Sequence, residues 1–536
     1  MRLVVTALAL LLGAACAESR TRSALAPPPP RDPAFAQGNL CARCHSVSPR
    51  ASALYNRLGD DVSPHGLWRG TLMANSLRDP YFRAQFAREV ELQPADEAQL
   101  GQLCLRCHTP MAHHQARLDG VALAPIAQLD ADPLARDGVS CTVCHQAQPE
   151  NLGQPASFSG QLEIRPEHTI FGPYPDPFAG PMRMQTGYTP TQGAHIQASA
   201  LCGACHTLST HHAPGAEAFL EQSPYLEWRN SVFSDEAGGG SESRTCQQCH
   251  MPDEGTLRIA RNPGGRDFSI APRTHVRAHA FLGGNAYVLD LLRTNRVELG
   301  VEAPVETLER AAAGTRRQLA QDTARVTIEN TRREDGELRF DVHVENLTGH
   351  KFPAGYPSRR AWLEVEVRGG GHTLFLSGAA DEHGRLRGVA DERALPHRDT
   401  VEDASGVVVY EMRALDAQGA RTTQLSRMAS VAKDTRLLPR GWRADGPHAA
   451  ETAPVGIEGD ADFVGGGDVV HYRLKLPAGM EGRLGLFADL RYQTIPPAWV
   501  DDLRALDAQA ARTFVRLYDT HPPEPESVGS AVFSLE

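Results

Sequence analysis

One short motif recurs along the first half of the chain and constrains its folding more than any other feature. The pattern C-x-x-C-H occurs five times in the 536 residues, and it takes every cysteine except Cys16. Five copies of one pattern on a single chain predict five equivalent sites. The paired cysteines and the following histidines are Cys41, Cys44 and His45; Cys104, Cys107 and His108; Cys141, Cys144 and His145; Cys202, Cys205 and His206; and Cys246, Cys249 and His250.

The spacing within each copy has a chemical reason. Two thiols three positions apart on one helical turn can form thioethers with the two vinyl groups of one porphyrin, and the histidine that follows is aimed at the iron. A zinc ribbon does not need a histidine after each pair, and a thioredoxin-like pair occurs once, in a βαβ context. We therefore predict five covalently bound haems c, with the ten motif cysteines as attachment residues and the five motif histidines as proximal ligands.

Each haem iron has a second axial position, which decides between an electron carrier and a catalyst. Five further histidines would close all five irons, and the haem-bearing half holds nine outside the motifs. They are His65, His113, His114, His168, His195, His211, His212, His275 and His279. Any one of them can instead be an ordinary surface or structural histidine.

Four runs resemble a known family. They are Asp137-Gly138-Val139-Ser140, His195-Ile196-Gln197-Ala198-Ser199, His250-Met251-Pro252 and the run from His279 to Asn285. Together they resemble the cytochrome c-554/hydroxylamine oxidoreductase superfamily of multihaem cytochromes, over residues 39 to 290. The resemblance implies His195 and His279 as distal ligands. His113 or His114 and His211 or His212 come next, followed by His65 and His275.

A methionine is a further candidate ligand. In the related cytochromes a helix with the pattern Trp-x-x-Ser-x-His supplies an axial histidine. Two runs here are similar, and the histidine position is Met73 in the run from Trp68 and Phe233 in the run from Trp228. Phenylalanine cannot coordinate iron, whereas a methionine thioether can. Met73 is therefore either an axial ligand or a packing residue beside a porphyrin.

The N-terminus is typical of an export signal. Arg2 precedes an apolar run that is too short to span a bilayer. The segment Leu12-Gly13-Ala14-Ala15-Cys16 resembles a lipobox, which predicts lipidation of Cys16, although ordinary cleavage next to Cys16 also fits. We expect a signal peptide of lipoprotein type at 1–16, a Pro-rich linker at 17–38, a pentahaem domain at 39–290, a connecting helix at 291–321 and a β domain at 322–536.

The second half has a different pattern. Short alternating runs such as Leu338 to Val344 and Val469 to Leu474 are bounded by Gly, Asp and Pro, which is typical of antiparallel strands. The predicted fold class is α+β: a loop-rich, mostly helical pentahaem domain followed by an antiparallel β-sandwich-like domain, with a helix over 497–518 against it. The segment from Asn346 to Arg360 resembles one in the β domain of many bacterial multihaem cytochromes. His350 in it is either a turn residue or the cap of one iron.

Charge narrows the choice of partners. A net charge of −11 argues against nucleic acid and favours redox partner proteins, either basic proteins or other cytochromes. We expect an electron-transfer cytochrome of the periplasm or outer membrane, with membrane contact only through the lipid anchor. The alternative is a multihaem oxidoreductase acting on a small nitrogen or sulfur compound at one five-coordinate haem. The chain lacks the C-x-x-C-K motif of pentahaem nitrite reductases.

Overall fold

The computed structural model describes residues 33–236 and 238–536, and residues 34–536 form one compact unit. The predictions for the export signal, for Cys16 and for most of the linker lie outside the described residues. Among the residues that are described, no helix has both the length and the apolar composition needed to cross a membrane.

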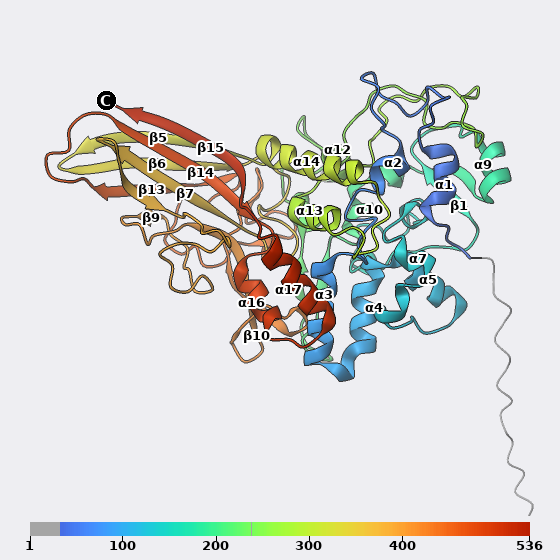
Figure 1. The fold of residues 1–536 in the computed structure, drawn as a ribbon, viewed down its shortest axis with the longest axis horizontal. Helices are drawn as coiled ribbons and strands as arrows, with labels where there is room; N and C mark the ends of the chain where they lie inside the picture. The colour runs from blue at the N-terminus through green and yellow to red at the C-terminus, as the bar shows by residue number, and fades with distance from the viewer. Residues whose placement is uncertain (1–32, 237) are drawn as a thin grey trace, which may run out of the picture. The chain divides into compact units, whose positions relative to one another are not determined.

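The first half consists of short helices joined by long loops (Figure 1). Several of these helices begin at a proline that follows a capping side chain. At α3, for example, the carboxylate of Asp79 accepts hydrogen bonds from the N–H groups of Tyr81 and Phe82. The helices are α1 (Gly38–His45), α2 (Pro64–Trp68), α3 (Pro80–Leu92), α4 (Glu97–His108), α5 (Pro110–Asp119), α6 (Ile126–Leu129), α7 (Pro133–Arg136), α8 (Cys141–Cys144), α9 (Ala179–Thr186), α10 (Ser199–Gly203), α11 (Pro224–Arg229) and α12 (Cys246–His250).

Two small strand pairs lie among these helices: β1 (Thr169–Gly172) pairs in parallel with β2 (Thr189–Gln192), and β3 (Leu208–Thr210) pairs antiparallel to β4 (Phe219–Gln222). The larger strands of the second half are β5 (Ala324–Glu334), β6 (Glu337–Asn346), β7 (Arg360–Gly369), β8 (His372–Ser377), β9 (Thr400–Val401), β10 (Val409–Asp416), β11 (Arg421–Thr422), β12 (Met428–Asp434), β13 (Gly467–Lys475), β14 (Leu484–Gln493) and β15 (Glu526–Leu535).

These strands form two sheets. One has the order β11-β10-β7-β14-β15, with β12 on β10 and β8 on β7, and the other has the order β5-β6-β13-β9. All pairs are antiparallel except the short β13–β9 pair. On β6, residues alternate between the buried and the outer face, as the period of two requires. Phe340 and Tyr472 from one sheet share a core with Val365 and Leu486 from the other. The α+β class and the sandwich are confirmed.

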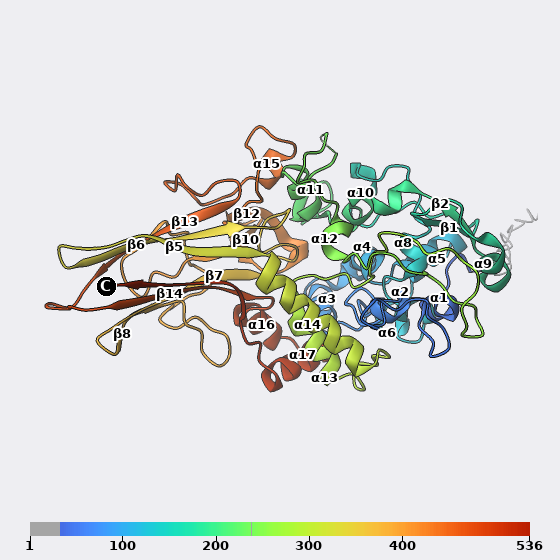
Figure 2. The ribbon, with the colours of Figure 1, turned by 90° about the horizontal axis from the view of Figure 1, so that it is seen from above.

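A second core joins the two halves. It contains helices α13 (Ala286–Thr294) and α14 (Val305–Asp322), and the C-terminal helices α16 (Pro497–Arg504) and α17 (Gln509–Thr520). Phe514 and Leu517 of α17 pack with Tyr81 and Ala84 of α3. Figure 2 shows α14 running from the sheets towards the helical half.

The C-terminal region differs from the sequence prediction. The single helix expected over 497–518 is two helices that turn between Ala505 and Ala508, and the chain ends on strand β15. The apolar face of α17 contacts α3 because that helix offers aromatic and small side chains, and such a long-range contact leaves no local sequence pattern.

A buried ion network also connects the halves. Arg436 lies 3.2 Å from Glu227 of α11 and 2.8 Å from Asp434, and the Lys351 ammonium lies 2.6 Å from Asp434. Burial alone would raise the pKa of Asp434, but Arg436 and Lys351 outweigh it and lower that pKa to about 2. The carboxylate of Asp434 is therefore ionised, as buried charge pairing requires.

Candidate haem-attachment sites

All five motifs lie at helices or directly after them. α1, α4 and α12 each end at the motif histidine, α8 ends one residue before it, and α10 holds the first cysteine of its motif. One helical turn thus brings the two cysteines of a motif to the same side. The ten motif cysteines are free, without disulfides.

Four of the motif histidines are oriented by main-chain carbonyls. The Nδ1 atom of His45 lies 2.9 Å from the oxygen of Ile259, that of His145 lies 2.6 Å from Phe171, and that of His108 lies 3.3 Å from Ser76. His250 makes the same contact with Leu282. A carbonyl only accepts, so Nδ1 donates and Nε2 keeps its lone pair, which is the form that binds metal.

Burial keeps these rings neutral. It lowers the pKa of His108 to about 4, and it lowers the pKa of His45, His145 and His250 in the same direction. A protonated imidazole cannot bind a metal ion. These four motif histidines are therefore neutral and available for coordination at neutral pH, whereas His206 is exposed.

Two motif histidines face a second imidazole. The rings of His145 and His279 are 18° from parallel with centroids 6.1 Å apart, and those of His250 and His350 are 10° from parallel at 6.3 Å. Nitrogen binds a transition metal at about 2.0–2.1 Å, and adding the ring radii places two imidazoles on opposite sides of one ion with centroids roughly 6.4 Å apart. Both spacings fit a six-coordinate haem iron, with His145 and His250 as proximal residues.

The second ring of each pair is fixed by its own hydrogen bonds. Nδ1 of His279 lies 3.2 Å from the carbonyl of Arg277, and Nδ1 of His350 lies 2.9 Å from that of Lys351. The N–H of Lys351 donates to Glu227 at 3.0 Å, so the buried ion network positions His350. The donor set therefore fits haem c: paired thiols, a neutral motif imidazole and, in two sites, an opposed imidazole.

The structure separates the two adjacent histidines on α5. His113 Nε2 lies 2.9 Å from the Gln102 side-chain oxygen. The side chain of His114 is only 2% exposed, and neither of its ring nitrogens has a hydrogen-bond partner. An unpartnered buried imidazole is costly unless it binds something, so His114 is the better ligand candidate of the two.

The remaining candidate histidines also differ in burial and in hydrogen bonding. His211 is exposed and contacts the carbonyl of Ala216, whereas Nδ1 of the less exposed His212 is buried without a partner. His195 is partly buried, with Nε2 2.9 Å from the carbonyl of Ala147. His275 is exposed and pairs with Asp253.

His65 and Met73 are both partly buried. The ring of His65 lies against Trp68, with centroids 5.7 Å apart, and burial lowers its pKa to about 4. The carbonyl of Met73 accepts a hydrogen bond from Val139 at 2.9 Å. Phe233, at the equivalent position of the second run, lies under the guanidinium of Arg440.

The motifs lie close to one another. The Cys41 thiol interacts with that of Cys141, and the Cys202 thiol interacts with that of Cys246. The Cys107 thiol interacts with that of Cys205, and the Cys144 thiolate acts on the pKa of Cys205. Thiol contacts link the first motif to the third, and the fourth motif to both the second and the fifth. The third and fourth motifs are close enough for the charge of Cys144 to act on Cys205.

Sequence reasoning missed a polar cluster beside the second motif. Burial first, and then the carboxylates of Glu221 and Glu89, raise the pKa of the Cys104 thiol. Burial raises the pKa of Glu221 to about 7. One carboxylate oxygen of Glu221 and the hydroxyl of its neighbour Tyr356 are buried without partners. Of the residues in this cluster, only Tyr356 lies in a segment that the sequence analysis singled out, residues 346–360.

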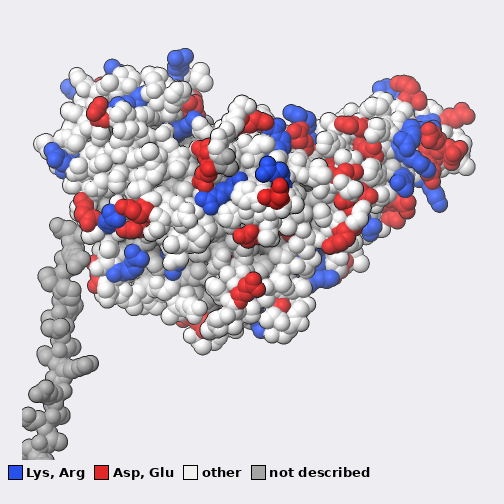
Figure 3. All heavy atoms as spheres, turned by 180° about the vertical axis from the view of Figure 1, so that it is seen from behind, with Lys and Arg blue, Asp and Glu red and all other residues white. Residues whose placement is uncertain are grey.

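The charged surface is mixed. On the face shown in Figure 3, acidic and basic side chains are interspersed and are densest at the sandwich end. Much of the surface over the helical half on this face is uncharged. This face therefore offers no patch of a single sign.

No protein-family model and no curated protein matches the sequence. One solved structure is similar: a penta-heme cytochrome c552 from Thermochromatium tepidum, with 16% identity and a TM-score of 0.51, over 94% of this chain and 100% of that chain. At this identity the likeness concerns the fold: residues 34–536 fold like a penta-heme cytochrome c.

Proposed function

We propose that this chain is an electron-transfer cytochrome with five covalently attached haems c. The observation that carries the proposal is the closeness of the five motifs: three pairs of motifs meet through their thiols, and the third motif lies near the fourth. Haem iron supplies one-electron exchange between its ferric and ferrous states. The chain's own residues attach the haems side by side, orient the axial imidazoles and limit the access of water, which together favour transfer from one haem to the next.

The opposed imidazoles support transfer over catalysis. His279 and His350 face His145 and His250, so with haem bound they would hold the second ligand position of two irons and would leave no place there for a substrate. The test is a count of low-spin and high-spin haems in the oxidised holoprotein by electron paramagnetic resonance. Five low-spin haems are expected. One or more high-spin haems would contradict a pure electron carrier.

The polar cluster beside the second motif supports a second function, that of an oxidoreductase. Glu221, Tyr356 and Tyr81 form a buried, incompletely hydrogen-bonded cluster beside Cys104, and the ring of Phe82 lies flat on that of His108 at a centroid distance of 3.5 Å. A carboxyl group with a pKa near neutrality can donate or accept a proton. An oxidoreductase acting on a small nitrogen or sulfur compound would use the second motif's haem as its five-coordinate site.

Ligand binding separates the two functions. Nitrite, hydroxylamine and sulfite are added to the oxidised holoprotein, and the Soret band is followed. A spectral change that Tyr356→Phe and Glu221→Gln weaken, and that Tyr472→Phe in the separate core of the sandwich leaves intact, supports the oxidoreductase. No spectral change with any of the three supports the electron carrier.

Cellular location is part of the proposal. Export before haem attachment and lipidation of Cys16 would place the protein in the periplasm or at the outer membrane, as expected for a partner of other cytochromes or basic redox proteins. The superfamily resemblance over residues 39 to 290 supports this setting. Cys16→Ala should release the protein from the membrane fraction. Release of the unmutated protein under the same mild wash would refute lipid anchoring.

A further inference from the structure

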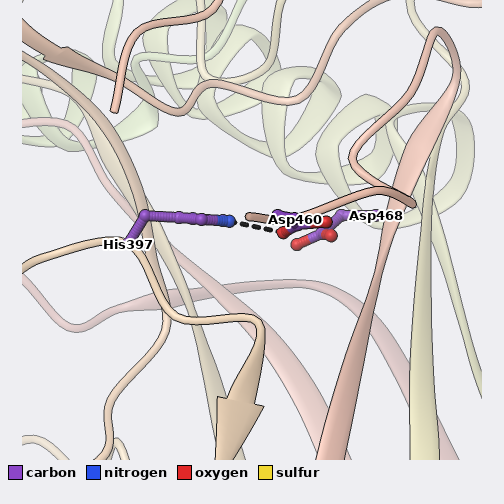
Figure 4. A group of neighbouring side chains, drawn as sticks. All are labelled: His397, Asp460 and Asp468. Carbon is purple, nitrogen blue, oxygen red and sulfur yellow. Dashed lines mark hydrogen bonds and ion pairs between the residues drawn. The ribbon is translucent and has the colours of Figure 1, made fainter. Parts of the chain in front are cut away.

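The β domain contains a group of titratable side chains far in sequence from the haem motifs. His397 lies just before β9, Asp460 lies in the loop before β13, and Asp468 is the second residue of β13. One potential ligand atom from each lies within 4.8 Å of the others. Figure 4 shows the imidazole of His397 pointing at the two carboxylates, which lie side by side.

The three side chains are shielded from water. The side chains of His397 and Asp460 are 6% and 1% exposed, and Asp468 is 1% exposed. Nε2 of His397 lies 2.6 Å from Asp460 Oδ2. Asp468 Oδ2 accepts a hydrogen bond from the Tyr410 hydroxyl at 2.7 Å, while Asp468 Oδ1 and His397 Nδ1 are buried without partners.

Negative charge at this place is not balanced by the protein. In the described part of the chain, no lysine or arginine forms an ion pair with Asp460 or Asp468. Buried carboxylates that have no permanently charged cation as partner are energetically unfavourable. A bound metal cation, or a proton on one of the two carboxylates, would remove this unfavourable energy.

A neighbouring group adds to the imbalance. His471 on the outer face of β13 lies 2.6 Å from Asp341 and 3.2 Å from Asp462, and 3.8 Å from Asp399. Asp462 also interacts with Asp460. The combined cluster has five carboxylates against two imidazoles. It would stay negative even with both imidazoles protonated, and such a field concentrates cations.

Asp460 is fixed in a geometry suited to a ligand. Its Oδ1 accepts hydrogen bonds from the N–H groups of Asp462 and Phe463, at 3.2 and 2.9 Å, which leaves Oδ2 directed at His397. The ring of Phe463 packs edge-on against that of His397 with centroids 5.5 Å apart. At metal sites, contacts of this kind hold the metal-binding side chains in the orientation that coordination requires.

The donor atoms indicate which ion fits. Calcium and magnesium take oxygen ligands, whereas zinc accepts imidazole nitrogen together with carboxylate oxygen in four-coordinate sites. We propose that His397, Asp460 and Asp468 bind one zinc ion, with water as the fourth ligand. The ion ties the loops before β9 and β13 to the sheet, as a structural site separate from the haems.

A proton on Asp468 is the competing explanation, because burial raises the pKa of this carboxyl to about 7. Direct metal measurement separates the two. The holoprotein is stripped with a chelator and dialysed against Zn²⁺, and zinc and iron are then counted by mass spectrometry. We expect one zinc per chain, with affinity reduced about 10–100-fold or more by the near-isosteric Asp468→Asn and by His397→Gln.

A control variant and melting temperatures test whether zinc binds at this particular site. His275→Gln removes an exposed histidine that also pairs with an aspartate, and it should leave zinc binding unchanged. Zn²⁺ should raise the melting temperature of the unmutated holoprotein and of His275→Gln, but not that of the site variants. Three outcomes would overturn the proposal: no bound zinc, equal zinc in the site variants, or displacement of zinc by equimolar Ca²⁺.

Discussion

His350 shows how one residue can connect the two halves. Its ring lies nearly parallel to that of His250, and its neighbour Lys351 is held by Glu227 and Asp434. This arrangement supports the proposal that the β half would contribute an imidazole ligand, His350, to the haem held by the fifth motif. The alternative, a plain turn residue, does not require this facing geometry.

Removing that imidazole should open one iron position. His350→Ala is expected to convert one haem from low-spin to high-spin, as measured by electron paramagnetic resonance, because it removes the ring that faces His250. The exposed His372→Ala is the matched control and should keep the spin count of the unmutated protein. An unchanged count in His350→Ala would make His350 a turn residue.

The buried ion network around Asp434 makes the stability of the fold depend on pH. The folded pKa of Asp434 is about 2, below the usual value near 3.9, so the carboxylate stabilises the fold above about pH 4. This contribution, about 2–3 kcal/mol, is lost as the pH falls towards 2. Asp434→Asn should cost about 3–5 kcal/mol at pH 6 because the buried Lys351 loses its carboxylate partner and Arg436 keeps only Glu227.

Urea unfolding at pH 6 and at pH 2.5 measures this effect. The difference in unfolding free energy between the unmutated protein and Asp434→Asn should shrink at the lower pH. Asp445→Asn changes an exposed ion pair with Arg443 and should change stability little at either pH. A constant difference for Asp434→Asn would show that its charge is not the cause.

At the scale of elements, α17 holds the C-terminal region against the helical half. Phe514 is 0% exposed and packs with Tyr81 of α3. Phe514→Ala should lower the free energy of unfolding by about 3–5 kcal/mol, as large-to-small changes in a core do. Phe533→Ala, at a phenylalanine that is 37% exposed, should cost much less. Equal losses in urea denaturation would place α17 outside the core.

Local patterns predicted the elements that have a local cause. The alternation from Leu338 to Val344 identified a strand, because one face of β6 is buried. The contact of α17 with α3 joins residues more than 400 positions apart and had no local signature. The choice between His113 and His114 depended on Gln102, which lies on the preceding helix α4.

The haem-attachment sites and the proposed zinc site also differ in how far the local sequence predicts them. The C-x-x-C-H motifs carry their chemistry within five consecutive residues. His397 and Asp460 lie in separate loops and Asp468 lies on β13, and the three meet only through the pairing of β9 with β13. Glu221 and Tyr356 likewise meet only in the fold.

At the scale of the molecule, the described chain from residue 34 onward is one compact unit. A core shared by α3, α13, α14, α16 and α17 and a buried ion network cross between its halves. We therefore expect one cooperative thermal transition. The Soret absorbance and the far-ultraviolet circular dichroism at the strand minimum should change at the same temperature. Two transitions separated by several degrees would show that the halves unfold independently.

The central claim is that five haems are covalently attached to this chain. The most direct test is the intact mass of the purified protein after extraction with acidic organic solvent, which removes haem that is not held by thioethers. The account predicts the mass of the mature chain plus five haems, and four for a variant with Cys104→Ser and Cys107→Ser. A mass with fewer than five haems on fully loaded unmutated protein, or haem released into the solvent, would contradict it.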